Sequence, residues 1–208
     1  MPATSRPRAR RLSYADRHQQ LLDVAFELLE TGGSEGVRMD ALARAAKVTR
    51  PVVYEHFANR EALLVALIEQ HGRRLRSEVV AADARSGDFE TDLRASVRAY
   101  VTGVKRRGAA LRSLMSSVGV SPTVERARSE VWNAAIDNWT TRYVDGFEID
   151  HADARALAEF HLQGLWALAG RCAADEISTS RVEELHAQIV LASLRAVATD
   201  SALAPGFE

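Results

Sequence analysis

The side chains with the clearest chemistry lie between residues 49 and 60. Arg50 carries a guanidinium, which can donate two parallel hydrogen bonds to a guanine, a contact worth about 1–3 kcal/mol of discrimination between bases. The same group can instead bind a phosphate, which carries no sequence information. Tyr54 and His56 can bind backbone phosphate or support the fold, and Val52 can contact a thymine methyl or simply pack. This stretch therefore has the groups of a nucleic-acid-binding surface.

Such side chains need a rigid element to position them, and Met39 to Phe57 predicts two short helices joined by a tight turn. Leu42, Ala45 and Ala46 give the first helix a narrow apolar face. Lys47 then breaks the periodicity. The first helix is thus expected to end at this lysine.

The second helix is marked by a cap, a proline and an apolar pair. Thr49 can offer its hydroxyl to a free backbone amide, and Pro51 falls in the first turn, where its missing N–H costs nothing. Val53 and Phe57 are four residues apart, so they share a face that can dock on the first helix. Two helices joined in this way, the second presenting polar groups, form the helix-turn-helix that enters the DNA major groove.

Charge is distributed unevenly along the 208 residues. The formal net charge is −1, but residues 1–60 carry 10 Lys and Arg against 7 Asp and Glu, whereas the rest carries 17 against 21. A basic N-terminal part on an acidic body is expected when only one end meets phosphate. Residues 1–12 hold four arginines and no acid. This arm can enter a minor groove or serve only as a solubilising tail.

Composition favours a packed, mostly helical protein, since 47% of the residues are hydrophobic and there are only 12 Gly and 5 Pro. Cys172 is the single cysteine, which excludes an internal disulfide and a cysteine-cluster metal site and fits a reducing cytoplasm. The best apolar run, Leu162 to Gly170, is too short to span a membrane, and no apolar segment of a secretory signal follows the basic start. We expect a cytoplasmic protein with no membrane partner.

Hydrophobic periodicity and its breaks predict an all-α protein of about nine helices. Ser13 and Asn59 are placed to cap two of them, and Gly32-Gly33 and Gly108 to interrupt the chain between others. The expected helices cover residues 13–31, 39–46, 49–57, 59–85, 89–105, 109–117, 122–147, 152–174 and 180–199.

Three segments resemble the first four helices of the tetracycline-repressor (TetR) family of bacterial transcription regulators: LLDVAFELLETGG, MDALARAAKVT and RPVVYEHFANREALLVALIE. The most specific part is the Y-x-H-F run at residues 54–57, followed by Arg60 and Leu63. The resemblance covers residues 15–70; beyond them only length and helicity agree. It implies a three-helix DNA-binding head and a helical ligand-binding and dimerisation body. We therefore expect an arm at 1–12, a helix-turn-helix domain at 13–60, a ligand-binding and dimerisation domain at 61–200 and a tail at 201–208.

At the matched positions, the resemblance implies contacts with an operator in double-stranded DNA. Arg60 takes the place of a phosphate-contacting lysine. Arg38 stands where a capping Thr or Ser is usual, which loses a cap worth about 1 kcal/mol but offers a guanidinium to a phosphate. Lys47 replaces a turn glycine, at a strain of roughly 1–2 kcal/mol if it is left-handed, and Pro51 removes a backbone donor. The implied DNA-binding residues are Arg38, Lys47, Thr49, Arg50, Val52, Tyr54, His56 and Arg60.

An aromatic stripe in the body follows 4-3-4 spacing on one helical face. It can line a pocket for a small apolar effector, which the resemblance places among the middle helices, or it can be ordinary core. His161 can likewise be a ligand contact or a hydrogen-bonded core residue. The candidate ligand-binding residues are Leu114, Met115, Val118, Trp132, Ile136, Trp139, Tyr143, His161 and Trp166.

The last two helices carry apolar stripes that can form a four-helix interface between two subunits or pack within one chain. The residues are Leu157, Phe160, Leu165, Leu168, Val182, Leu185, Ile189 and Leu194. The resemblance implies a homodimer, in which two recognition helices about 34 Å apart read a palindrome.

Enzyme chemistry finds little support in the sequence. There is no Gly-rich phosphate loop, nucleophile elbow or H-E-x-x-H pair, and His151, Asp153 and His161 lack metal-ligand spacing. We expect no catalytic residue, metal or cofactor, and a DNA-binding regulator, most simply a repressor released by a small apolar ligand. Two alternatives stay open: a helical small-molecule-binding protein or enzyme whose helix-turn-helix is only scaffold, and a constitutive DNA binder whose body only dimerises.

Overall fold

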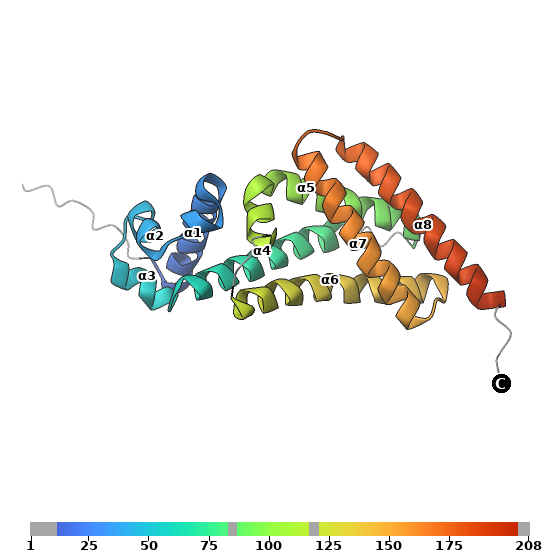
Figure 1. Cartoon of the computed structure of the whole chain (residues 1–208), viewed down its shortest axis with the longest axis horizontal. Helices are drawn as coiled ribbons and strands as arrows, with labels where there is room; N and C mark the ends of the chain where they lie inside the picture. Colours follow the sequence, from blue (N-terminus) through green and yellow to red (C-terminus); the bar gives the residue numbers. More distant parts are fainter. Residues whose placement is uncertain (1–11, 83–86, 117–120, 204–208) are drawn as a thin grey trace, which may run out of the picture.

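A computed structural model of the chain describes residues 12–82, 87–116 and 121–203, which form α-helices and no strand (Figure 1). The helices are α1 (Tyr14–Gly36), α2 (Met39–Ala45), α3 (Arg50–His56), α4 (Arg60–Ala82), α5 (Phe89–Ser116), α6 (Pro122–Phe147), α7 (His151–Ala173) and α8 (Thr179–Leu203). Gly33 in α1 (φ 60°, ψ −165°) and Gly108 in α5 (φ 54°, ψ −140°) are both non-helical, at the two places where the sequence predicts an interruption. The all-α prediction is confirmed. Val118 and most of the predicted arm lie outside the described residues.

The elements fall into a head and a body. Figure 1 shows α1, α2 and α3 grouped at one end of an elongated molecule, α4 running from them into the body, and α7 and α8 on the side away from the head. We use "head" for α1 to α3 with the first half of α4, and "body" for the remainder.

Local capping explains where several helices begin. The Ser13 hydroxyl accepts from the Asp16 N–H at 3.1 Å, and the Asn59 side-chain oxygen accepts from the Ala62 N–H at 2.8 Å, as predicted. Thr49 does occupy the position before α3, but its hydroxyl makes no capping bond, so that prediction was wrong in its chemistry. Arg38 precedes α2 without a side-chain cap, which confirms the expected loss.

The turn between α2 and α3 closes on a left-handed lysine. Lys47 has φ 55°, its N–H donates to the Arg44 carbonyl at 3.2 Å, and the Val48 N–H donates to the Ala43 carbonyl at 3.0 Å. This pair of bonds is a Schellman motif, which usually has glycine at the left-handed residue. The buried face of α2 includes Leu42, Ala43 and Ala46, whereas Ala45, which was predicted to lie on that face, is exposed.

Two apolar clusters form the core. The body cluster joins α5, α6, α7 and α8. The head cluster joins α1, α2, α3 and the first half of α4, and it also takes in Ala110 and Leu114 of α5 and Val124 and Ala127 of α6. Leu114, a predicted wall of the ligand pocket, therefore belongs to the head core. The head cluster spans the boundary expected at residue 60.

Arg60 holds the start of α4 to the turn between α1 and α2. Its Nε donates to the Val37 carbonyl at 2.8 Å and its Nη2 to the Ser34 carbonyl at 2.5 Å, with Glu35 3.6 Å away. The structure thus gives Arg60 an intramolecular role, whereas the resemblance implied a phosphate contact.

Two glycines allow α4 to pass close to its neighbours. A Cβ added to Gly72 would lie 2.7 Å from a Val131 methyl of α6. A Cβ added to Gly103 of α5 would lie 2.7 Å from Leu75 of α4. Val131 is short and β-branched and cannot move aside, so the crossing at Gly72 requires glycine, whereas at Gly103 the flexible end of Leu75 can shift.

Replacing Lys47 by glycine is expected to raise the free energy of unfolding by about 1 kcal/mol, because glycine adopts the left-handed conformation without strain. Urea denaturation measures the change. Lys47→Ala removes the same charge and keeps the strain, so it serves as the control; equal stability of the two variants would contradict the explanation.

Replacing Arg60 by alanine is expected to lower the free energy of unfolding by about 1–3 kcal/mol, because two backbone carbonyls lose a charged donor. The control is Arg73→Ala, which breaks only an exposed ion pair with Glu69. Thermal and urea unfolding of both variants test this, and a loss no larger than that of the control would refute the role assigned to Arg60.

Candidate functional site

The surface of α3 divides into a buried and an exposed side, as its spacing predicts. Val53 and Phe57 are buried in the head cluster, whereas Arg50, Pro51 and Tyr54 are exposed. Val52 is half-buried, which is consistent with either of its expected roles. Of the other predicted DNA-binding residues, Arg38, Lys47 and Thr49 are exposed beside α3. The helix-turn-helix therefore presents a polar surface built from both of its helices and the turn.

Arg50 is held by a partner that sequence reasoning missed. Its Nε lies 2.8 Å from Oδ1 of Asp40 on α2, and the two side chains are 62% and 48% exposed. At such exposure an ion pair contributes about 0–1 kcal/mol, so it restricts the side chain of Arg50 without fixing it. The pair joins different helices, and spacing within one helix gives no signal for it.

His56 supports the fold, one of its two predicted roles. Its ring packs on Tyr14 of α1 with centroids 4.2 Å apart, and the Tyr14 hydroxyl donates to the Glu55 carbonyl at 3.4 Å. Burial lowers the pKa of His56, and the nearby His18 lowers it further. These contacts fix the end of α3 against α1. Tyr14 was not predicted, because contacts between distant segments leave no local pattern.

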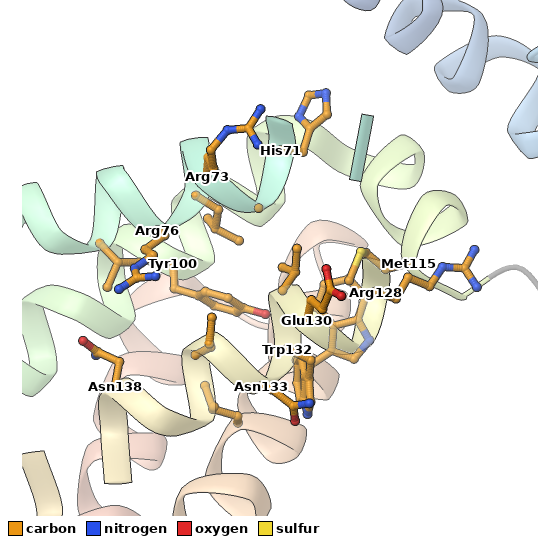
Figure 2. Close-up of a pocket in the computed structure, with 18 of the residues that line it drawn as sticks. His71, Arg73, Arg76, Tyr100, Met115, Arg128, Glu130, Trp132, Asn133 and Asn138 are labelled. Carbon is orange, nitrogen blue, oxygen red and sulfur yellow. The ribbon is translucent and has the colours of Figure 1, made fainter. Parts of the chain in front are cut away.

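A cavity of about 630 Å³ lies between α4, α5, α6 and α7 (Figure 2). Four of the predicted ligand-binding residues line it, namely Met115, Trp132, Trp139 and Trp166. The volume is within the range of small-molecule sites, roughly 300–1,000 Å³. The site is therefore a cavity that a small molecule can occupy.

Sequence reasoning missed most of the α4 and α5 side of this cavity. Leu75 and Val79 line it from α4, and Ser96, Val97 and Tyr100 line it from α5. Figure 2 shows Tyr100 crossing the cavity between these helices and α6. From one turn to the next within each helix, these residues are three or four positions apart, so they share a helix face. The sequence shows this spacing, but any buried helix face has the same spacing, so it does not single out a cavity.

Three predicted ligand-binding residues lie elsewhere in the body. Ile136 and Tyr143 are buried in the body cluster and do not line the cavity, because their side of α6 faces α7 and α8. His161 is buried outside the cavity and joins three helices. For these three residues the ordinary core alternative is the correct one.

The tautomer of His161 follows from its partners. The Ser193 hydroxyl donates to backbone carbonyls of α8 at 2.9 Å, so it accepts from Nε2 of His161 at 2.9 Å. Nδ1 is then the acceptor for the Tyr143 hydroxyl at 3.1 Å. Burial lowers the pKa of His161 to about 4, so the ring is neutral at pH 7. His161 therefore links α6, α7 and α8 by hydrogen bonds.

The predicted dimer stripe divides into exposed and buried residues. Phe160 is 67% exposed and Ile189 is 50% exposed, two of the largest values for apolar side chains in the described ranges. Leu157, Leu168 and Leu185 are half-buried beside them. Three other residues of the stripe, Leu165, Val182 and Leu194, fill the core of the monomer, because their sides of α7 and α8 face the body. For these three the expected place in a dimer interface was wrong.

The described residues contain neither a membrane-crossing helix nor a cluster of metal ligands. None of their helices combines the length and apolar character that crossing a bilayer needs. Nor do those residues bring three or more His, Cys, Asp or Glu side chains together as metal ligands.

Known proteins resemble this chain in sequence. The family described as "Bacterial regulatory proteins, tetR family" matches residues 21–67. The HTH-type transcriptional activator FasR of Mycolicibacterium smegmatis is 35% identical over 99 residues, which are 48% of this chain and 45% of FasR. The HTH-type transcriptional regulator EthR of the same organism is 28% identical over 140 residues, 65% of this chain and 63% of EthR. The chain thus spans less than two thirds of these curated relatives.

Solved structures resemble it over most of its length. A TetR-like transcriptional regulator from Rhodococcus sp. RHA1 superposes with a TM-score of 0.73 at 22% identity, covering 89% of this chain and 99% of that one. The fatty acid degradation regulator FadR from Bacillus halodurans gives 0.72 at 17% identity, covering 86% and 96%. At these identities the likeness shows a shared fold. The family match falls on the helix-turn-helix and its flanking helices, so this part of the chain, residues 21–67, belongs to the tetR family of bacterial regulatory proteins.

Proposed function

We propose that the protein is a transcription regulator that binds a palindromic DNA operator as a homodimer and is released by a small, largely apolar molecule. The observation that carries the proposal is the exposed side of α3, on which Arg50 and Tyr54 stand free of the head core that Val53 and Phe57 anchor. A helix presented in this way is what major-groove binding requires. FasR and EthR, which are named as transcriptional regulators, support the assignment.

Arg50 is the proposed base reader, and the residues around it bind the backbone. Arg38, Lys47 and Thr49 offer a guanidinium, an ammonium and a hydroxyl, which are suitable partners for phosphate. Tyr54 is 46% exposed and can reach the backbone from the same side. Arg60 is left out of the interface because two backbone carbonyls and Glu35 hold its guanidinium at the turn between α1 and α2.

The dimer interface is proposed on the exposed sides of α7 and α8. Phe160 and Ile189 are the apolar anchors. Gly164 lies one helical turn after Phe160 on α7, and a Cβ added to it would have no atom within 4 Å. Small residues of this kind let two helices approach closely. A twofold pairing of α7 and α8 would place one head on each side of the dimer, as a palindrome needs.

The effector is proposed to act through α4. Gly72 and Leu75 of α4 line the cavity, while Leu63 and Leu67 of the same helix lie in the head core. A ligand that fits the cavity better in one position of α4 favours that position, and the separation of the two heads changes with it. The ligand must prefer the state that does not bind DNA, because equal affinity for both states shifts no population.

Selection of genomic fragments by the purified protein, followed by mobility shift on the selected palindrome, tests DNA binding. Salt-dependent, sequence-selective binding is expected, and its absence would refute the proposal. We propose repression, whereas FasR is named an activator. A reporter gene behind the operator decides the direction, because its output falls with a repressor and rises with an activator.

Replacing Arg50 by alanine is expected to reduce discrimination at one base pair of each half-site by about 1–3 kcal/mol, because a bidentate contact is lost. Arg38→Ala is expected to weaken binding to all DNA sequences alike. It should also reduce by about 1 the slope of the logarithm of the affinity against the logarithm of the salt concentration. Mobility shift on operator variants measures both. Arg126→Ala, on the exposed side of α6, is the control. A uniform loss for Arg50→Ala would show that it contacts only phosphate.

Replacing Phe160 by glutamate is expected to weaken the dimer by more than about 2 kcal/mol, roughly thirtyfold, because a carboxylate would be buried without a partner. Analytical ultracentrifugation measures the dissociation constant, and circular dichroism checks the fold. Ala81→Glu places the same charge on an exposed site of α4 as the control. An unchanged dimer would show that subunits associate through another surface.

A further inference from the structure

The cavity contains hydrogen-bond donors that the protein leaves unused. All three tryptophans of the chain, Trp132, Trp139 and Trp166, line it. An indole nitrogen can only donate, and indoles within proteins usually find an acceptor. None of these three indoles donates to another residue in the described ranges. The donors therefore remain available to a bound molecule.

Ser96 and Tyr100 add two hydroxyls from one face of α5. They are four residues apart, and both line the cavity. The Ser96 side chain is 1% exposed and its Oγ has no hydrogen-bond partner among the described residues. The Tyr100 hydroxyl likewise has none there, and burial raises its pKa, so it stays protonated at neutral pH. Figure 2 shows the hydroxyl end of Tyr100 directed towards Trp132.

The charged residues of the lining do not favour a charged ligand. Arg73 pairs with Glu69 at 3.5 Å, and Arg128 donates to the Leu114 carbonyl at 2.9 Å and pairs with Glu125. The other charged side chains of the lining, Arg76 and Glu130, are exposed, so water screens them. A ligand charge placed among the tryptophans would lose its hydration without gaining a close counter-charge.

We propose that this cavity binds a neutral, largely apolar molecule whose oxygens accept hydrogen bonds, such as an aromatic ketone, with Tyr100 and Ser96 as its polar anchor. The three indoles, Tyr100 and Ser96 all present N–H or O–H donors, and the indoles cannot accept, so this part of the lining matches carbonyl or ether oxygens better than a protonated amine. The inference rests on the proposed function only in calling the molecule an effector.

Four small molecules test which chemical groups of a ligand the cavity prefers. Benzophenone has two aromatic rings and a carbonyl oxygen, and diphenylmethane has the same rings without the oxygen. Benzoate and benzyltrimethylammonium bring a negative and a positive charge. Isothermal titration calorimetry of the full chain without DNA gives each dissociation constant. Quenching of tryptophan fluorescence confirms the location, because every tryptophan of the protein lines the cavity.

The wild-type protein is expected to bind benzophenone roughly three- to tenfold more tightly than diphenylmethane, the effect of one neutral hydrogen bond. Tyr100→Phe keeps the ring and removes the hydroxyl, so it should abolish most of this difference and leave diphenylmethane binding unchanged. Ser96→Ala should reduce the difference in the same direction. Tyr143→Phe removes a buried hydroxyl outside the cavity and should leave the difference intact.

Two results would overturn the proposal. One is tighter or equal binding of diphenylmethane, or tighter binding of either charged probe, by the wild-type protein. The other is an unchanged preference for benzophenone in Tyr100→Phe. Because no DNA is present, these results do not depend on operator binding. A protein that prefers benzophenone but binds no palindrome would refute the regulator and leave the cavity chemistry standing.

Discussion

The passage of α4 from one apolar cluster to the other constrains the whole molecule. Leu63 and Leu67 lie in the head core, whereas Leu75 packs on the body cluster. Between them Gly72 meets Val131 of α6 so closely that even a methyl group would not fit. A helix cannot bend sharply without breaking its own hydrogen bonds, so a shift at one end is carried along it. The head therefore cannot reorient independently of the helices that enclose the cavity.

A second connection joins the end of α5 and the start of α6 to the head. Arg128 of α6 donates to the Leu114 carbonyl near the end of α5, and the Ser121 hydroxyl donates to Glu61 in the first turn of α4. These bonds, with the residues of α5 and α6 in the head cluster, seat the head on the body. The head is thus held at two places, along α4 and beside it, which is why the apolar core does not divide at residue 60.

Features decided within one or two helical turns could be predicted from the sequence. The buried pair Val53 and Phe57, the left-handed Lys47 and the caps at Ser13 and Asn59 all depend on neighbours close in the chain. Contacts between distant segments could not, and the Arg50–Asp40 pair and the Tyr100 side of the cavity were missed. Apolar stripes were ambiguous for a further reason. Helices α7 and α8 are apolar on more than one side, so spacing alone does not separate Val182, in the core, from Ile189, on the surface.

The ion pair between Arg50 and Asp40 has a consequence for the entropy of recognition. Asp40 lies 2.8 Å from the Nε of the guanidinium, and the two terminal nitrogens make no hydrogen bond to the described residues, so they remain available as a pair of donors. A fork of two donors is what the O6 and N7 of a guanine accept. A free arginine loses about 2 kcal/mol of rotamer entropy when it is ordered. Here the carboxylate already restricts the side chain in the unbound protein, so part of that loss belongs to folding and less of it remains to oppose binding.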